Sequence, residues 1–397
     1  MSWICHQLGS REHYSIPRAL HLRDSLRLLQ TDAWVRPELQ WLPRLVGQQA
    51  LASRYHPQLA DAAVRDFTLG RLSFDLRSKL SRKDSWAAIT ERDQWFQKKC
   101  LLGLKSALAE DNDAVVFSYA YTARTLFEYA EKSGAASILG QIDPGPAELD
   151  CLREFLPPKI ANELEDRPIT YWNAWRDEVN LADHMIVNSP WSKELLVNRA
   201  NVPATKISIL PLAYEPTPHA TSARHYPEGF SKSRPLKLLF LGQIIHRKGV
   251  HLLLEVMERL RDRPVVLDLV GPSEIDLTGA PKNVRFHGSV DSGRAQQFYA
   301  DADLFCLPTL SDGFALTQLE AAAHHLPLLV SRFCGQVVEH QKNGLLLNEV
   351  TTESIESAIL HCIENPQDLE QWSAHELDWE KYSLNTLGER LVTLGST

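Results

Sequence analysis

A basic turn in the second half of the chain has the residue types that bind an anionic group. In LFLGQIIHRKGVHLLLEV, residues 239–256, an apolar run stops at Gly242 and a second one follows Gly249. Between them lie Gln243 and the cationic pair Arg247 and Lys248. Free backbone N–H groups and the positive end of a helix dipole would lie beside two fixed cations, so the turn predicts a phosphate or diphosphate site. A solvated Arg-Lys pair without a ligand is the competing interpretation, and the turn alone does not separate the two.

A second group of candidates lies in LPTLSDGFALTQLEAAAHHLPLLVS, residues 307–331, where we expect a strand, a loop, a helix and a strand. The loop glycine permits close backbone approach, and ionised carboxylates accept hydrogen bonds from vicinal hydroxyls. Together with the basic turn, this pattern predicts a nucleotide-sugar site. Taken singly, the first acid is more typical of a helix N-cap and the second of a surface ion pair with an arginine, and only their combination with the basic turn favours the site. The candidate residues are Asp312, Gly313, Phe314, Ala315, Leu316 and Glu320.

The first half of the chain holds weaker candidates. The turn GSREHY follows a short apolar run and presents Gly9 and Arg11 to whatever lies beyond the strand. His13 in the same turn and Asp143 in GQIDPGP are candidate polar residues on the acceptor side of an active site. Each of these residues is also typical of an ordinary solvated turn or loop.

The segment GRLSFDLRSKLSRKDSW, residues 70–86, interleaves basic and apolar side chains. Such a pattern is typical of segments that lie on anionic lipid surfaces. A charged helix face or a loop of an acceptor domain is the favoured alternative.

Composition excludes several classes of protein. The chain has 397 residues, of which 44% are hydrophobic and 23% charged, as in a folded protein of two or three domains. Its net charge of −8 argues against nucleic acid as a partner. The six cysteines form no C-x-x-C pair, so neither a zinc site nor a disulfide framework is expected. Since no signal peptide and no run of roughly 18 apolar residues is visible, we expect a cytoplasmic protein whose only membrane contact is peripheral.

The candidate residues must be positioned by strands and helices, and these alternate clearly after residue 235. The preceding stretch, 214–235, is rich in Pro, Ser and Thr, and we take it as a domain boundary. Such an array predicts a doubly wound parallel sheet with ligands at the carboxyl ends of its strands. We expect strands at 236–241, 265–270, 284–286, 304–307 and 328–331, and helices at 250–260, 294–300 and 315–324.

The first half is harder to parse. We expect a helix whose apolar positions run through Ile16, Leu20, Leu26 and Leu29, mostly helical or irregular sequence over 31–105, and a final helix over 384–394. Further strands are expected at 3–8, 114–118, 136–141, 183–189 and 206–212, with helices at 124–133 and from about 190.

Residues 236–347 resemble the donor-binding domain of retaining glycosyltransferases of family 4, which have the GT-B fold of two facing Rossmann-like domains. The matches are the G-x-x-x-x-(R)KG turn at 242–249, VG at 270–271, FHGSV at 286–290, YADADLFCLPTLSDGFALTQLEAAAHHLPLLVS at 299–331, Gly335 and NGLLL at 343–347. The segments 182–196 and 209–216 are similar to the end of the family's first domain.

The resemblance implies roles for individual residues. Lys248 would bind the donor diphosphate, Glu320 the ribose hydroxyls and Asp312 the transferred sugar. The backbone of 313–316 would surround the sugar and phosphate, and the loop from Gly288 to Val290 would lie against the base. The glycine-rich loop that faces the diphosphate would correspond to the turn at Gly9.

Three departures qualify the resemblance. The family's paired acids are usually both glutamates, whereas the first is Asp312 here, and the basic residue that often follows the first glycine is Gln243. Arg247 is our candidate for the missing charge. The strand that often ends in a histidine near the transferred sugar ends here in Ser118, Tyr119, Ala120 and Tyr121, so no histidine is carried over.

We therefore expect a retaining, metal-independent glycosyltransferase that moves a sugar from a nucleotide-diphosphate sugar to a hydroxyl of a glycan, lipid-linked or small-molecule acceptor. Residues 1–225 would form the acceptor domain and 226–381 the donor domain, with a C-terminal helix over about 382–397 packing back on the first. Two alternatives stay open: a catalytically silent subunit that binds a nucleotide sugar or a partner protein, and a nucleotide-sugar epimerase or phosphorylase on the same scaffold.

Overall fold

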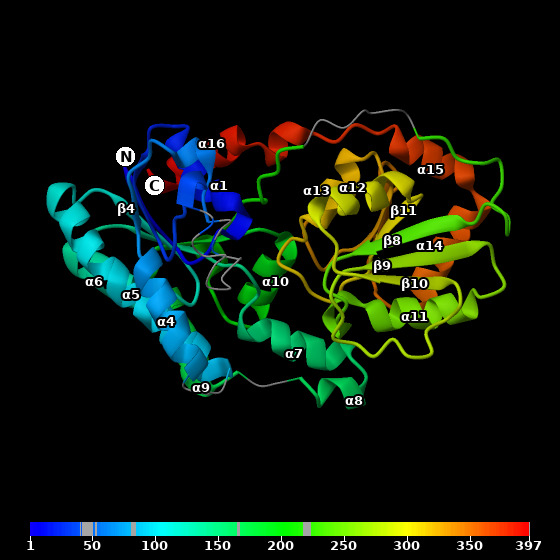
Figure 1. The fold of residues 1–397 in the computed structure, drawn as a ribbon, viewed down its shortest axis with the longest axis horizontal. Coiled ribbons are helices and arrows are strands. Elements are labelled where there is room, and N and C mark those ends of the chain that lie inside the picture. Colours follow the sequence, from blue (N-terminus) through cyan, green and yellow to red (C-terminus); the bar gives the residue numbers. More distant parts are fainter. Residues whose placement is uncertain are drawn as a thin grey trace.

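The computed structural model describes residues 1–39, 41, 51, 54–80, 85–164, 167–216 and 224–396, and Figure 1 shows them as two α/β domains side by side. The first sheet has seven parallel strands in the order β3-β2-β1-β4-β5-β6-β7. These strands are β1 (Trp3–Gln7), β2 (Leu26–Thr31), β3 (Val64–Asp66), β4 (Val115–Tyr119), β5 (Ser137–Gly140), β6 (His184–Val187) and β7 (Ile207–Ile209).

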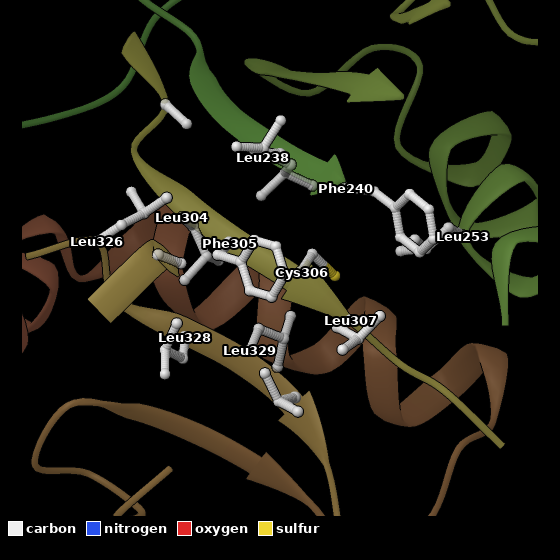
Figure 2. Packing of buried hydrophobic residues seen from close by; sticks show 14 of the residues in the cluster. Leu238, Phe240, Leu253, Leu304, Phe305, Cys306, Leu307, Leu326, Leu328 and Leu329 are labelled. Atoms are coloured by element: carbon white, nitrogen blue, oxygen red, sulfur yellow. The ribbon is translucent and has the colours of Figure 1, made fainter. Parts of the chain in front are cut away.

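The second sheet has six parallel strands in the order β10-β9-β8-β11-β12-β13. Helices cover both faces of such sheets, so their strands are continuous apolar runs. Figure 2 shows the result, with Leu238 near Leu304 and Phe305 of the neighbouring strand and the ring of Phe240 beside Leu253. The strands are β8 (Leu236–Leu241), β9 (Val265–Val270), β10 (Val284–Gly288), β11 (Leu304–Leu307), β12 (Leu328–Ser331) and β13 (Gly344–Leu347).

The helices of the first domain include the final helix of the chain, which lies against α1 and thus returns to the N-terminal sheet (Figure 1). They are α1 (Ser15–His21), α4 (Thr68–Leu80), α5 (Ser85–Glu110), α6 (Arg124–Ser133), α7 (Pro146–Phe155), α8 (Pro158–Ala161), α9 (Ile169–Leu181), α10 (Pro190–Asn198) and α16 (Leu384–Gly395). Those of the second domain are α11 (Val250–Arg259), α12 (Ser292–Asp301), α13 (Thr317–Ala323), α14 (Thr352–Glu364) and α15 (Pro366–Ser373).

Both sheets reverse their strand order at one place, between β1 and β4 in the first and between β8 and β11 in the second. The loops that leave neighbouring strands on either side of such a switch point diverge, and ligands bind in the crevice that results. The basic turn follows β8 and the loop with Asp312 follows β11, so the fold brings the two predicted motifs to one switch point.

Two predictions of elements are wrong. The expected helix through Ile16, Leu20, Leu26 and Leu29 is only α1, because the chain turns at residues 22–24 and Leu26 begins β2, whose Leu29 pairs with Cys5 of β1. The stretch 31–105 also contains strand β3, which the prediction did not include. Of the predicted boundary stretch 214–235, residues 217–223 lie outside the described residues.

Candidate functional site at the carboxyl ends of β8 and β11

The basic turn is tied to the loop after β11 by its own backbone. The amide of Leu310 and the hydroxyl of Thr309 both donate to the carbonyl of Arg247, at 2.8 and 3.1 Å. Gly249 has φ +74°, and a Cβ built on it would lie 2.0 Å from the carbonyl oxygen of Pro308. The turn can therefore approach the second loop this closely only with glycine at this position.

This contact puts the two predicted charged motifs together. The Lys248 ammonium donates to a carboxylate oxygen of Asp312, and each side chain is only 14% exposed. The Arg247 guanidinium donates to the carbonyl of Ser311 at 2.8 Å and lies 4.0 Å from the Asp312 carboxylate. Burial alone would raise the pKa of Asp312, but Lys248 and Arg247 hold it below its ordinary value, so the acid is a carboxylate that faces two cations.

A carboxylate of the first domain completes this charged cluster. Glu148, in the first turn of α7, accepts a hydrogen bond from the Ser311 hydroxyl at 2.8 Å and lies 3.8 Å from the Arg247 guanidinium. Burial lowers the pKa of Arg247, yet Glu148 and Asp312 together raise it above its usual value. The predicted cations are therefore neutralised within the protein, and an anionic ligand must compete with these two carboxylates.

The two domains touch closely at this point. A Cβ built on Gly313 would lie 2.3 Å from the carbonyl oxygen of Ile142, which follows β5 of the first domain. The indole N–H of Trp191, in α10, donates to the Ser311 hydroxyl at 3.1 Å. Helices α7 and α10 lie on the side of the first domain that faces the second (Figure 1). The loop after β11 is thus part of the interface between the domains.

Among the backbone amides of the loop 313–316, that of Phe314 donates to the Asp312 carboxylate. Within the described parts of the chain, the amides of Ala315 and Leu316 donate to no recorded acceptor. Ala315 has φ +66°, outside the helical region, so α13 begins at Thr317 rather than at the predicted residue 315. Phe314 is buried, and its carbonyl accepts from the amide of Gly335 at 3.0 Å.

Asp312 is not the N-cap of α13, and no described arginine pairs with Glu320, so both of the simpler interpretations of these acids are wrong. Leu316, not Asp312, precedes the first residue of α13. Glu320 accepts a hydrogen bond from the hydroxyl of Tyr299 at 2.6 Å rather than pairing with an arginine. The two acids lie in the same loop-helix unit, yet no described contact joins them.

The remaining candidates of the second domain lie at the carboxyl ends of the neighbouring strands. Gly288 ends β10, and its carbonyl accepts from the amide of Gly271, which follows β9, at 2.8 Å. Val290 packs against the hydrophobic core and Gln243 is exposed. The structure places these residues on the same edge of the sheet as Lys248 but shows no contact between them and the charged cluster.

In the first domain, the turn after β1 has an unusual backbone. Glu12, His13 and Tyr14 all have positive φ, at 53, 49 and 60°. The amide of Gly9 donates to the carboxylate of Asp32, which is buried, at 2.8 Å, and His13 is exposed. No described contact joins Gly9 or His13 to the second domain, so the predicted role of this turn beside a diphosphate stays a prediction.

Asp143 is a structured residue rather than a solvated one. Its carboxylate accepts from the hydroxyl of Tyr121 at 2.6 Å and from the amide of Gly145 at 2.9 Å, and it lies 3.9 Å from the guanidinium of Arg167.

The sequence analysis did not identify three residues of the site: Glu148, Tyr121 and Arg167. An acid five residues beyond Asp143 at the start of a helix was the available signal for Glu148, but nothing local points to the other two.

The basic segment 70–86 is partly described. Arg71 points inward, where it pairs with Asp32 at 2.8 Å and with Asp75 at 2.9 Å, and Phe74 is buried. Leu76 is exposed, as is Leu69 just before the segment, whereas residues 81–84 lie outside the described residues. The inward-facing side chains of this segment, Arg71 and Phe74, therefore stabilise the first domain.

The described residues contain neither a membrane-spanning helix nor a cluster of metal ligands. No helix among them is long and apolar enough to cross a membrane. Over the same residues, no cluster of three or more histidine, cysteine, aspartate or glutamate side chains has an arrangement that would hold a metal ion.

Solved structures with this arrangement have the GT-B fold. The chain aligns over its full length with HepE of Anabaena, whose structure contains UDP, at a TM-score of 0.58 and 16% identity, and covers 100% of that chain. It also aligns with sucrose-phosphate synthase of Thermosynechococcus elongatus at a TM-score of 0.64 and 15% identity, covering 98% of both chains. The fold is thus GT-B, with two Rossmann-like domains.

Residues 235–365 match the family described as Glycosyl transferases group 1, so the second domain of this chain is a Glycosyl transferases group 1 domain. Among curated relatives, alpha-galactosylglucosyldiacylglycerol synthase of Streptococcus pneumoniae is 26% identical over 166 residues, which is 38% of this chain and 44% of that protein. D-inositol 3-phosphate glycosyltransferase of Arthrobacter is 26% identical over 193 residues, 43% of this chain and 45% of that protein. The chain spans less than half the length of these relatives.

Proposed function

We propose that the chain is a retaining, metal-independent glycosyltransferase that transfers a sugar from a nucleotide-diphosphate sugar to an acceptor hydroxyl. The observation that carries the proposal is the convergence of Lys248, Arg247 and Asp312 with the amides of 313–316 at the switch point of the second sheet. The similarity of residues 235–365 to Glycosyl transferases group 1, and the presence of UDP in a structural neighbour, support a nucleotide-sugar donor.

The first step in this proposal is an exchange of partners at Lys248. In this structure its ammonium pairs with Asp312. A diphosphate in the same crevice would bind Lys248 and the free amides of the loop, because phosphate oxygens accept charge-assisted hydrogen bonds. Asp312 would then be released to accept hydrogen bonds from hydroxyls of the transferred sugar, as the resemblance to the family implies.

The chemical step needs stabilisation of a leaving diphosphate. The bond between the anomeric carbon and the phosphate oxygen breaks, the sugar becomes oxocarbenium-like, and the acceptor oxygen forms the new bond while its proton passes to the departing phosphate. Negative charge grows on the diphosphate during this step. Lys248, Arg247 and fixed amides in a partly buried site stabilise that charge without reorganising, which is the main way in which such sites accelerate reactions. Retention follows if the acceptor approaches the face from which the diphosphate departs.

Donor binding is the first test. Purified protein is screened by thermal shift against UDP-, GDP-, ADP- and dTDP-sugars, since a ligand at 100 times its dissociation constant stabilises by roughly 2.7 kcal/mol. Isothermal titration of the best ligand then compares Lys248→Ala with Lys342→Ala, which removes an exposed lysine of the same domain. We expect at least a tenfold rise in the dissociation constant for the first variant only. Equal affinities for both variants would exclude Lys248 from the donor site.

Product analysis tests the finer parts of the proposal. NMR of the product assigns the anomeric configuration, and activity measured with EDTA tests metal independence. Transfer with inversion, or loss of activity in EDTA that added Mg²⁺ restores, contradicts the corresponding part. Donor binding with neither transfer nor hydrolysis would favour the silent subunit, and a changed free sugar would favour an epimerase or phosphorylase.

We place the reaction in the cytoplasm, in the synthesis of a glycan, polysaccharide or glycolipid. All six cysteines are free thiols in buried positions, which fits a reducing compartment. A peripheral membrane contact through the exposed face of α4 belongs to this proposal and is tested by co-sedimentation with vesicles of increasing acidic lipid content. Sedimentation that does not depend on acidic lipid contradicts it.

A further inference from the structure

A second switch point, in the first sheet, holds a cavity that the donor motifs do not occupy. It has a volume of about 250 Å³ and lies beyond the carboxyl ends of β1, β4 and β5, between the loops that leave these strands and residues of α5 and α9. Ligands bind in parallel sheets at such places. The loop after β5 contributes Ile142, whose carbonyl oxygen is the atom that approaches Gly313. The cavity therefore borders the loop that carries Asp312.

One wall of the cavity is aromatic. Tyr121 and Tyr171 stack with ring centroids 4.9 Å apart, and Trp86 packs edge-on against Tyr171 at 5.4 Å. The indole N–H of Trp86 is buried and has no recorded acceptor within the described residues. A wall of aromatic rings with a free donor suits the flat apolar face and the hydroxyls of a sugar ring.

The other feature of the cavity is its positive charge, since three arginines line it against two aspartates. Arg167 lies 3.9 Å from Asp143 and within 4.8 Å of the centroid of the Trp172 ring, and the Arg92 guanidinium donates to Asp93 at 2.7 Å. These two arginines have carboxylate partners, and burial raises the pKa of Asp93.

Arg11 differs from both. It is exposed, lies over the ring of Tyr119 at 5.7 Å, and forms no ion pair among the described residues. Its neighbour Glu12 accepts hydrogen bonds from the hydroxyls of Tyr119 and Ser15, both at 3.2 Å. Burial raises the pKa of Glu12, and the charge of Arg11 offsets part of that rise. The Arg11 guanidinium thus attracts Glu12 and Asp93 without a recorded hydrogen bond to any carboxylate of the described chain, and its N–H groups can act as a bidentate donor at the mouth of the cavity.

We propose that this cavity binds the acceptor and selects a saccharide that carries a phosphate or carboxylate group, with Arg11 holding the anion and the aromatic wall holding the sugar ring. The proposal rests on the proposed function, because it assigns the second substrate of the same cleft. It makes Arg11 a specificity-determining residue and places the acceptor beside the loop of Asp312 and Gly313.

The test measures binding of anionic and neutral sugars to the full chain. Glucose 6-phosphate, glucuronic acid and glucose are titrated calorimetrically with saturating UDP present, so that the donor site is filled. We expect both anionic sugars to bind at least tenfold more tightly than glucose, with an affinity that falls as NaCl is raised. The two anions distinguish phosphate from carboxylate as the preferred group. Equal affinity for all three sugars, or binding of none of them, overturns the proposal.

Variants locate the anion. Arg11→Ala should bring the affinity for both anionic sugars to within threefold of that for glucose, whereas Arg77→Ala, which removes an exposed arginine of α4, should change nothing. Tyr171→Ala should weaken anionic and neutral sugars by a similar factor. Retained UDP binding in each variant shows that the fold is intact.

Two results separate this inference from the proposed function. Anionic-sugar binding that UDP displaces and that Lys248→Ala abolishes would place the anion in the donor site and overturn the inference alone. Absence of nucleotide binding in the unmodified protein would overturn the proposed function, while selective binding of anionic sugars through Arg11 would still be measurable.

Discussion

The close approach of the basic turn to the loop after β11 predicts a specific effect of replacing Gly249 by alanine. The position has φ +74°, which costs an L-residue roughly 1–2 kcal/mol. The new Cβ would also lie 2.0 Å from the carbonyl oxygen of Pro308, so backbone must move, and such overpacking adds about 1–3 kcal/mol. We expect a total loss of about 2–5 kcal/mol in the free energy of unfolding.

Gly279 provides a matched control for this prediction. It has φ +80° and no atom within 4 Å of the built Cβ, so Gly279→Ala carries only the backbone cost. Urea unfolding followed by tryptophan fluorescence gives both losses, and titration with the best nucleotide sugar gives both donor affinities. Gly249→Ala should lose about 1–3 kcal/mol more than the control and bind donor at least tenfold more weakly, because the turn that carries Lys248 is displaced. Equal stability and equal donor affinity in the two variants would refute the reasoning.

Three further predictions concern the carboxylates. Asp312→Asn frees Lys248, so calorimetry should show the nucleoside diphosphate binding at least threefold more tightly while the transfer rate falls; unchanged binding contradicts the exchange of partners. Glu148→Ala leaves the buried Ser311 hydroxyl without its acceptor and should lower the free energy of unfolding by about 1–3 kcal/mol, whereas Glu148→Gln should lower it less. Identical losses in the two variants would show that the hydrogen bond from Ser311 to Glu148 does not stabilise the protein. Burial raises the pKa of Glu178 from 4.5 to about 7, although it accepts backbone hydrogen bonds, so the folded state keeps the proton that the unfolded state releases. The free energy of unfolding, measured relative to Glu178→Gln, should therefore fall by up to about 3 kcal/mol as pH rises from 4.5 to about 7. If urea unfolding gives the same difference between the two proteins at every pH in this range, the prediction is wrong.

The apolar runs of the sequence predict most of the second sheet, whereas β13, α14 and α15 are not among the expected elements. Strands β8, β9, β11 and β12 have the predicted bounds, because a strand buried on both faces is a continuous apolar run that ends where the run ends. Residue types in the loops that follow identified the cations and acids of the candidate site. In the first domain the same reasoning failed at β2, since the leucines at 26 and 29 also fit a helical period and only pairing with β1 selects the strand.

The tertiary structure alone decided which charges meet. Lys248 and Asp312 are 64 positions apart, and Glu148 and Ser311 are 163 apart and belong to different domains. The cavity beside Arg11 likewise draws its aromatic and cationic residues from several elements of the first domain. The local sequence pattern indicates the hydrophobic periodicity and the types of side chain in each segment, whereas the partner of a charged side chain depends on how the sheets and domains pack. A sequence read in order therefore identifies the groups that bind a ligand but not the ion pairs with which that ligand must compete.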